Sequence, residues 1–383
     1  MRLADLLARY PKARLATAAD NDRILEFFER SPMQAPAFDV QYLRRPDFFK
    51  LLRYQSDRAF VMLTEDDGGA VGSIATISLR PGWMDGRPIT VGYLGDLRVR
   101  FDRVFSRAWR GLFTDLVTRA HEIEELADCT HWITAVIDGN RAALSALRTD
   151  DRSNQPSLVP IGPFTMRNLI MRLPVVGRLR SSGPWEVCDA TDGDRAGLTT
   201  FFEEENRHVP FGFRSELARR IACWDGLSIT DFVYATDKRG IVACVAPWSP
   251  SAAKQTLVSR MPAALRLIGR GARVLPSPPL RVPEPGEPLR TPYLTHLTFA
   301  SRLAPDARAG VFRNMVDRLF DRWHGADWHC VALCDFQAWN LGRRLHGFVQ
   351  QTVPITVYAI VPPRQHPSVT PTLGPPAFEM AMV

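Results

Sequence analysis

The sequence predicts an α/β protein made of two tandem domains, each with a mixed central β-sheet flanked by helices. The chain has 383 residues, which is long for a single domain and suits two. Hydrophobic residues make up 45% of it, enough to form two cores. An internal repeat, and hairpins followed by strand, helix, strand and helix, indicate the same architecture.

The repeat consists of three matches that occur in the same order in both halves. First, the Ala-Thr and Phe-Phe pairs at 16–17 and 27–28 recur at 190–191 and 201–202. Second, YLGDLRV at 93–99 recurs as YLTHLTF at 293–299. Third, WITAVID at 132–138 resembles CVALCD at 330–335. The second copy is longer between its first two matches. It therefore carries an insertion.

The first copy begins with a short strand at 14–17 and a helix whose apolar residues lie at 24, 25, 27 and 28. Asp20 and Asn21 can cap this helix. Apolar strands at 60–64 and 71–79 then flank the sequence DDGG. Asp-Gly between two apolar runs is a strong signal for a hairpin.

The rest of the copy predicts alternating strands and helices. A turn at Asp85 and Gly86 leads to the strand that contains Tyr93. Residues 108–120 carry apolar side chains at helical spacing, which predicts a helix. A strand at 132–138 and a helix at 140–148 complete the copy.

We expect the first domain to span residues 1–178 and the second 185–361, because the segment between them is polar and rich in turn-forming residues. The second domain contains a basic, Pro-rich insertion at about 248–291. This insertion is either a solvated surface helix, or a lid, interface or anion-binding face. The tail, 362–383, is expected to be irregular.

Composition narrows the class of protein. The formal net charge of +7 favours anionic partners such as a phosphorylated cofactor, nucleic acid or acidic lipid, without choosing among them. We find no signal peptide and no apolar stretch long enough to span a membrane. The six cysteines are scattered and form no CxxC pair. We therefore expect a cytoplasmic protein without a metal site or disulfides.

Several common catalytic motifs are missing from the sequence. It contains no Walker loop, no GxGxxG after a strand, no GxSxG elbow and no HExxH. These absences argue against a nucleotide hydrolase, a dehydrogenase, a serine hydrolase and a zinc protease.

Four segments of the first copy carry a resemblance to a known family: RPDFF at 45–49, AVG at 70–72, VGYLGDLRV at 91–99 and DGNRAA at 138–143. They resemble the GNAT acetyltransferase superfamily, and in particular a group of bacterial proteins with two GNAT domains in tandem. The second copy matches by pattern. The resemblance implies an acyl-CoA-dependent N-acyltransferase that transfers an acetyl group from acetyl-CoA to a small-molecule or peptide amine. Nucleic acid is not predicted as its partner.

The resemblance also implies where coenzyme A binds. A pyrophosphate is held by unpaired N–H groups at a helix N-terminus, and the family pattern there is Arg/Gln-x-x-Gly-x-Gly/Ala. The nearest fit is Arg103, Ser106, Arg107 and Ala108, with Ser106 where Gly is usual. The alternative is an ordinary basic helix start that has lost the cofactor. The corresponding turn of the second copy fits less well, because Asp306 would repel a pyrophosphate.

In such a fold, the main-chain N–H groups around Leu97 and Val99 would polarise the acyl carbonyl. Asn140 would lie near the pantetheine arm, or would simply cap a helix. The family often has a Tyr that protonates the leaving thiolate, and Leu147 stands in its place.

Asp96 is the candidate general base, because it lies in the strand beside the expected acyl group. His296 occupies the equivalent position of the second copy and could titrate near neutral pH. For each residue a purely structural role is the competing interpretation.

Two other functions stay open from the sequence. The weakened phosphate loops and the missing Tyr also fit a non-catalytic tandem GNAT scaffold that binds a ligand or partner. The basic insertion also fits a transferase that uses another activated donor, such as an aminoacyl-tRNA.

Overall fold

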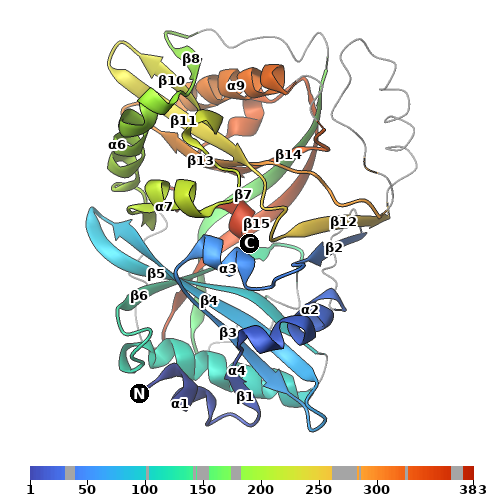
Figure 1. Ribbon diagram of the computed structural model, residues 1–383. Coiled ribbons are helices and arrows are strands. Elements are labelled where there is room, and N and C mark those ends of the chain that lie inside the picture. The colour runs from blue at the N-terminus through green and yellow to red at the C-terminus, as the bar shows by residue number, and fades with distance from the viewer. Residues whose placement is uncertain are drawn as a thin grey trace.

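The computed structural model describes residues 1–30, 39–100, 103–140, 144, 155–173, 183–260, 283, 286–323, 327–363 and 374–383. One 13-stranded sheet runs through both halves of the chain, with helices packed on it (Figure 1). The first half forms the lower part of Figure 1 and the second half the upper part. The C-terminus lies between the two halves, far from the N-terminus.

The first half contains these elements in order: α1 (Leu3–Leu7), β1 (Ala13–Leu15), η1 (Ala18–Asp20), α2 (Asn21–Glu29), β2 (Asp39–Leu43), α3 (Lys50–Gln55), β3 (Arg58–Glu65), β4 (Val71–Met84), β5 (Arg87–Val99), α4 (Arg103–Thr118), η2 (Ala120–Glu122), β6 (Cys129–Ile137) and β7 (Ser157–Arg172). The predicted hairpin is β3 and β4. Its turn is closed by the Asp66 carboxylate, which accepts hydrogen bonds from the main-chain N–H groups of Gly68 and Ala70.

The second half contains β8 (Glu186–Asp189), η4 (Asp192–Asp194), α6 (Arg195–Asn206), β9 (Gly212–Phe213), α7 (Glu216–Cys223), η5 (Ile229–Asp231), β10 (Val233–Asp237), β11 (Gly240–Trp248), β12 (Gln255–Arg260), β13 (Tyr293–Phe299), α9 (Pro305–Arg322), β14 (Val331–Phe336), η6 (Leu341–Arg344), β15 (Phe348–Val361) and η7 (Met380–Met382). The predicted mixed sheet is confirmed, because β5 pairs with β6 in parallel and its other neighbour, β4, is antiparallel.

The repeated segments occupy the same structural positions in the two halves. Thr17 and Thr191 each precede a short 3-10 helix, and the main-chain N–H of each donates to an Asp three residues on, at 2.8 Å. Asp20 is the N-cap residue of α2, as the sequence predicted, but its side chain caps η1 and makes no cap hydrogen bond to α2. Asp20 also pairs with Arg14 at 2.6 Å.

The two halves exchange their last strands. The sheet order places β15 between β6 and β7, and β7 in turn pairs with β14. Thus β15 of the second half pairs with a strand of the first, and β7 of the first half with a strand of the second. The predicted boundary falls mostly on residues 174–182, outside the described part of the chain, so the division at 178 and 185 stays a prediction.

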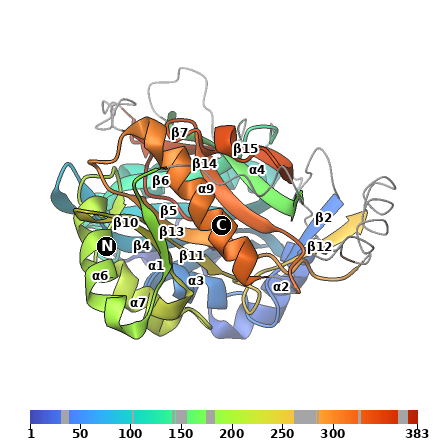
Figure 2. The same cartoon turned by 90° about the horizontal axis from the view of Figure 1, so that it is seen from above.

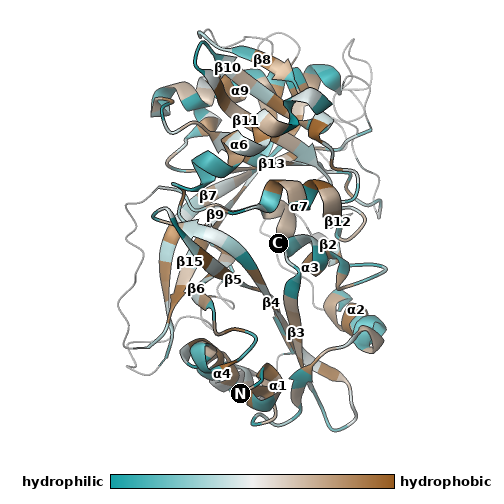
Figure 3. Ribbon diagram, turned by 60° about the vertical axis from the view of Figure 1, so that its left-hand side comes forward, coloured by the Kyte–Doolittle hydropathy of each residue, from teal (hydrophilic) through white to brown (hydrophobic). Residues whose placement is uncertain are grey.

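The helices cover the sheet through apolar faces, and Figure 3 shows teal and brown segments alternating along them. On α4 the buried side chains Trp109, Leu112 and Phe113 lie on the sheet, while Arg107 and Arg110 are exposed. The predicted helical spacing is therefore confirmed. No helix in the described ranges is long and apolar enough to cross a membrane.

Two segments join the halves beyond the main sheet. Strand β12 pairs antiparallel with β2, and the two lie side by side at one edge of the molecule (Figure 2). The end of the chain packs into the centre, where Ala381 and Met382 are buried. The tail was expected to be irregular. Its described part, 374–383, contains only the short helix η7 but is firmly packed, whereas 261–282 of the insertion lie outside the described residues.

Because the halves share strands, we expect thermal unfolding to show one cooperative transition in scanning calorimetry. The variant Val357→Ala removes a fully buried side chain from β15 and should lower the free energy of unfolding by about 2 kcal/mol. Thr352→Ala changes an exposed residue of the same strand and serves as the control. Two separate transitions, of which Val357→Ala lowers only one, would contradict the coupling.

Candidate active site

A β-bulge lies at the centre of the first half. In the pairing of β4 with β5, Thr76 is opposite Gly95 and Ile74 is opposite Arg98, so Asp96 and Leu97 together face the single residue between Ile74 and Thr76. Asp96 has a φ of 51°, in the left-handed region that Asp enters more readily than most residues. The bulge turns the strand and re-aims its side chains and N–H groups.

The same bulge recurs in the second half. Between β11 and β13, Ala246 is opposite Thr295 and Cys244 is opposite Thr298, and His296 has a φ of 56°. The repeat aligned Asp96 with His296 but did not reveal the bulge. The available signal was a titratable residue, Asp96 or His296, in the middle of each strand.

The strands next to each bulge separate. The parallel pairing of β5 with β6 ends at Tyr93 and Ile133, although β5 continues to Val99. The last link is a hydrogen bond from the Thr134 hydroxyl to the main-chain oxygen of Leu94, at 2.8 Å. Leu97 and Val99 lie beyond this point, where no strand among the described residues pairs with β5 on the β6 side. Beyond Leu94, the β5 backbone therefore has no strand partner on this side within the described residues.

Helix α4 begins where β5 ends. Its first turn presents N–H groups without intrahelical partners, which favour an anion. Arg107 is exposed and Ala108 half-buried. The side chains of Arg103 and Ser106 lie outside the described residues. Phe105 is buried, and a Cβ at Gly72 would meet its ring at 2.5 Å, so this pair holds the start of the helix against β4.

Arg100, one of the basic residues of this turn, already has a partner. Its guanidinium pairs with Asp66 at 2.9 Å and lies 4.8 Å from the Phe105 ring. Arg302 pairs in the same way with Asp237 of the β10–β11 turn, at 2.5 Å. Arg100, just after β5, therefore links to the β3–β4 turn, and Arg302, after β13, links to the end of β10.

The start of α9 differs from that of α4. Pro305 occupies the first turn, and the exposed Asp306 follows it and pairs with Arg343 at 2.9 Å. A carboxylate at this N-terminus stabilises the helix but competes with a phosphate. The start of α4 carries no acidic residue in its first turn, in contrast to the start of α9.

Asn140 lies at the start of a helical turn, because its main-chain oxygen accepts a hydrogen bond from the N–H of Leu144 at 3.0 Å. It follows β6 directly, on the side where β6 and β5 separate. Leu147, the residue in the place of the family's Tyr, lies outside the described residues.

His296 is 1% exposed and packs against the rings of Phe202, Trp224 and Phe232, at centroid distances of 5.2 to 5.5 Å. Burial, with a smaller contribution from Arg220, lowers the pKa of His296 well below its usual range. The imidazole is therefore neutral at physiological pH. This environment favours a packing role over proton transfer.

The chain's own tail occupies the second bulge. The Glu379 carboxylate accepts a hydrogen bond from the main-chain N–H of His296 at 2.8 Å and pairs with Arg220 at 3.1 Å. Burial raises the pKa of Glu379, while Arg220 opposes this shift. In the second half, the tail thus covers the bulge at the main-chain N–H of His296.

Asp96 has a different environment. Its carboxylate is 11% exposed and accepts a hydrogen bond from Arg44 at 2.6 Å, with the Thr76 hydroxyl at 3.4 Å from its other oxygen. Arg44, at the end of β2, was not among the residues that sequence reasoning selected. The contact depends on β2 folding back over the bulge, which local sequence does not reveal.

Three groups of solved structures are similar to this chain. The N-myristoyltransferase of Saccharomyces cerevisiae with bound myristoyl-CoA matches with a TM-score of 0.56 and 10% identity, over 93% of this chain and 84% of that one. A GCN5-related N-acetyltransferase from Sphaerobacter thermophilus matches with a TM-score of 0.53 and 11% identity, over 94% and 98%.

The third is a fungal multi-domain GH3 β-N-acetylglucosaminidase with a GCN5-related glucosamine N-acetyltransferase region, with a TM-score of 0.56, 10% identity, and coverage of 91% and 38%. The chain has a GNAT-type fold. No protein-family model matches the sequence, and no curated protein matches it significantly. The fold predicted from the sequence is thus confirmed.

Lys254 lies at the centre of this GNAT-type fold, just before β12, and is 6% exposed. Burial, with a smaller contribution from Arg44, lowers the pKa of Lys254 to about 7. Its ammonium group donates to the main-chain oxygen of Val383. The charged and titratable side chains that face it are Tyr42, Arg44, Asp96, Tyr293 and Cys334.

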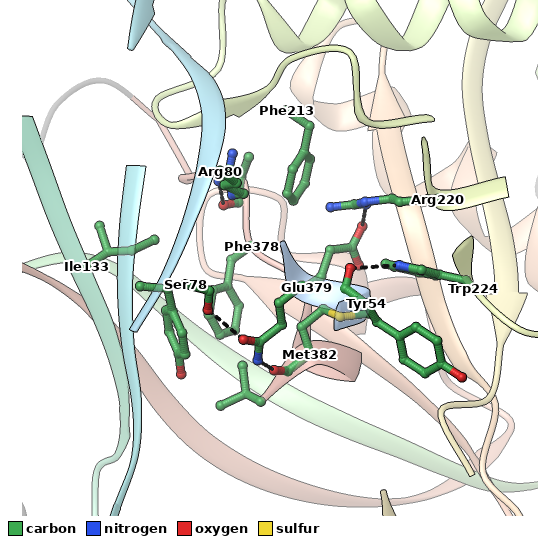
Figure 4. Close-up of a pocket in the computed structure, with 14 residues that line it drawn as sticks. Tyr54, Ser78, Arg80, Ile133, Phe213, Arg220, Trp224, Phe378, Glu379 and Met382 are labelled. Atoms are coloured by element: carbon green, nitrogen blue, oxygen red, sulfur yellow. Dashed lines mark hydrogen bonds and ion pairs between the residues drawn. The ribbon is translucent and has the colours of Figure 1, made fainter. Parts of the chain in front are cut away.

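A cavity of about 50 Å³ adjoins this region between the two halves. Tyr54, Arg80 and Tyr93 line it from the first half, and Arg220 and the tail from the second (Figure 4). Figure 4 shows Glu379 directed toward Arg220. No cluster of three potential metal ligands occurs within the described ranges.

We expect Lys254→Met to change how stability depends on pH. The folded-state pKa, about 7, lies below the ordinary value of 10.5, so the buried charge destabilises the native state most below pH 7. Between these pKa values wild-type stability should rise relative to the variant by about 1.4 kcal/mol per pH unit. Denaturant unfolding of both proteins across this range measures the difference, with the exposed Lys238→Met as control. A difference that is constant with pH would contradict the shift.

Proposed function

We propose that the protein is an acyl-CoA-dependent N-acyltransferase that binds acetyl-CoA in its first half and transfers the acetyl group to a primary amine. The observation that carries the proposal is the path formed by β5 and α4. A bulged strand separates from its parallel neighbour and leads directly into a helix N-terminus. Solved structures with the same fold include one with bound myristoyl-CoA, which supports an acyl-CoA donor.

The described residues fit the parts of such a donor. The N–H groups of the first turn of α4, with exposed Arg107, suit the pyrophosphate, and Arg103 and Ser106 belong to the same turn. The half-buried Ala108 leaves room close to the helix. The pantetheine arm would lie between β5 and β6, beside Leu97 and Val99, with Asn140 at the end of β6.

Transfer then needs a neutral amine close to the bulge. Its nitrogen attacks the thioester carbonyl carbon, and main-chain N–H groups of β5 stabilise the negative charge that develops on the carbonyl oxygen. Asp96 accepts the proton that the nitrogen loses. The carbon–sulfur bond breaks, and coenzyme A leaves as a thiolate that takes up a proton from water. The amide and free coenzyme A are the products.

The second half plays a supporting role in this proposal. Its bulge N–H is bonded to Glu379, and Asp306 occupies the start of α9. His296 is enclosed by aromatic rings and is not assigned a step in the transfer. The second half instead supplies Lys254 and the tail to the centre of the molecule.

The first test is isothermal titration of the protein with acetyl-CoA and, separately, with myristoyl-CoA. We expect acetyl-CoA to bind, and Arg103→Glu to weaken its binding at least about tenfold, because a carboxylate then faces the pyrophosphate. Arg308→Glu, in the first turn of α9, is the matched control and should leave binding unchanged. Loss of binding only in Arg308→Glu would move the donor to the second half. If neither acetyl-CoA nor myristoyl-CoA binds, the proposal is overturned.

A second test addresses Asp96. The variant Asp96→Asn keeps the hydrogen-bonding shape but loses the proton acceptor, so kcat should fall about 10²- to 10⁴-fold while acetyl-CoA affinity is retained. Glu26→Gln, at an exposed position, is the control. If folded Asp96→Asn turns over at the wild-type rate, Asp96 only holds Arg44 in place. Release of the coenzyme A thiol measures the rate.

A further inference from the structure

We propose that Arg44, Arg98 and Lys254 form a binding site for the carboxylate of a small amine acceptor, so that the substrate class is an aminocarboxylate of the size of an α-amino acid. The inference rests on the proposed N-acyltransferase function and names the acceptor of the same site.

Two like charges lie opposite each other where β2 pairs with β12. Tyr42 is opposite Thr256 and Leu43 is opposite Gln255, so the next step of the register brings Arg44 opposite Lys254. Both side chains are nearly fully buried, with exposures of 2% and 6%. Like charges that face each other across two strands destabilise the fold unless an anion lies between or beside them.

Arg98 adds a third cation on the same side of the bulge. It lies two residues after Asp96 on β5, and burial lowers its pKa, an effect to which the charge of Arg44 contributes. Its guanidinium and that of Arg44 both stack on Phe28, with distances of 4.8 and 5.6 Å to the ring centroid. The ring holds the two cations in position without neutralising them.

The cations outnumber the carboxylates. Asp96 is the one carboxylate in the described part of the chain that forms an ion pair with any of the three. With Lys254 protonated, three cations face this carboxylate, and when Lys254 is neutral the two arginines still outnumber it.

Within the described part of the chain, two buried donor atoms of this cluster have no hydrogen-bond partner, namely Nη1 of Arg44 and Nε of Arg98. A buried N–H without an acceptor costs free energy comparable to a lost hydrogen bond, and more when it carries charge. A planar carboxylate offers several acceptor positions to such donors.

The arrangement also suits the amine group of the acceptor. The amine must approach the acyl group at the bulge, where Asp96 attracts an ammonium group and then accepts a proton. The cations lie directly beside Asp96, so the site presents a negative group next to a positive cluster. This charge pattern is complementary to an amino acid, which carries an ammonium group next to a carboxylate. Because Arg44 and Lys254 are buried, the group that reaches them must be small.

The test supplies the protein with acetyl-CoA and each of the protein amino acids in turn, and measures release of the coenzyme A thiol. At least one amino acid should accelerate release. Its amide, which has the same amine but no carboxylate, should show kcat/KM at least about tenfold lower, because buried cations are left unpaired.

The variants Arg98→Met and Lys254→Met should remove most of this preference for the acid over the amide, while the affinity for acetyl-CoA stays unchanged. Arg239→Met and Lys238→Met replace exposed residues of the same types and should retain the preference. Circular dichroism and acetyl-CoA titration confirm that each variant is folded.

Two results would overturn the inference. One is an amide that serves as well as its parent amino acid. The other is a protein that binds acetyl-CoA but whose thiol release no amino acid stimulates, which would leave the proposed acyl-CoA function in place. Failure to bind acetyl-CoA would instead overturn the proposed function itself.

Discussion

The antiparallel pairing of β7 with β15 is the constraint on which the rest of the structure depends. Each of these long strands also pairs with a strand of the opposite half, so two sheets become one. The exchange fixes the two halves relative to each other and places the end of the chain between them. Arg44 of the first half lies beside Lys254 of the second, where β2 pairs with β12.

The two halves contain the same β-bulge in different surroundings. Both have a bulge with a left-handed polar residue, followed by a strand end and a helix. In the first half the residue is Asp96, paired with Arg44 beside a gap between strands. In the second it is His296, enclosed by aromatic rings and capped by the tail. The tail thus covers the second bulge, whereas Arg44 pairs with the polar residue of the first.

Sequence reasoning predicted what depends on neighbours along the chain. The apolar spacing of α4, the Asp-Gly turn between β3 and β4, and the strand that contains Asp96 are all encoded locally, and all are confirmed. The exchange of β7 with β15 could not be predicted, because an apolar strand does not specify its partner. Arg44 and Lys254 were missed for the same reason, since only the pairing of β2 with β12 brings them together. The roles assigned to Asp96 and Arg103 stay predictions.

The buried cations deserve a physical explanation because a protein gains no stability from them. Removing a charge from water costs several kcal/mol, and a neighbouring like charge adds to that cost. A lysine whose pKa is about 7 reduces the penalty by giving up its proton, and a guanidinium cannot do so under ordinary conditions. Apolar residues of similar size would stabilise the same position better. Within the described part of the chain, the ion pair of these three groups is the one with Asp96, and the proposed carboxylate of the acceptor would supply a second anion.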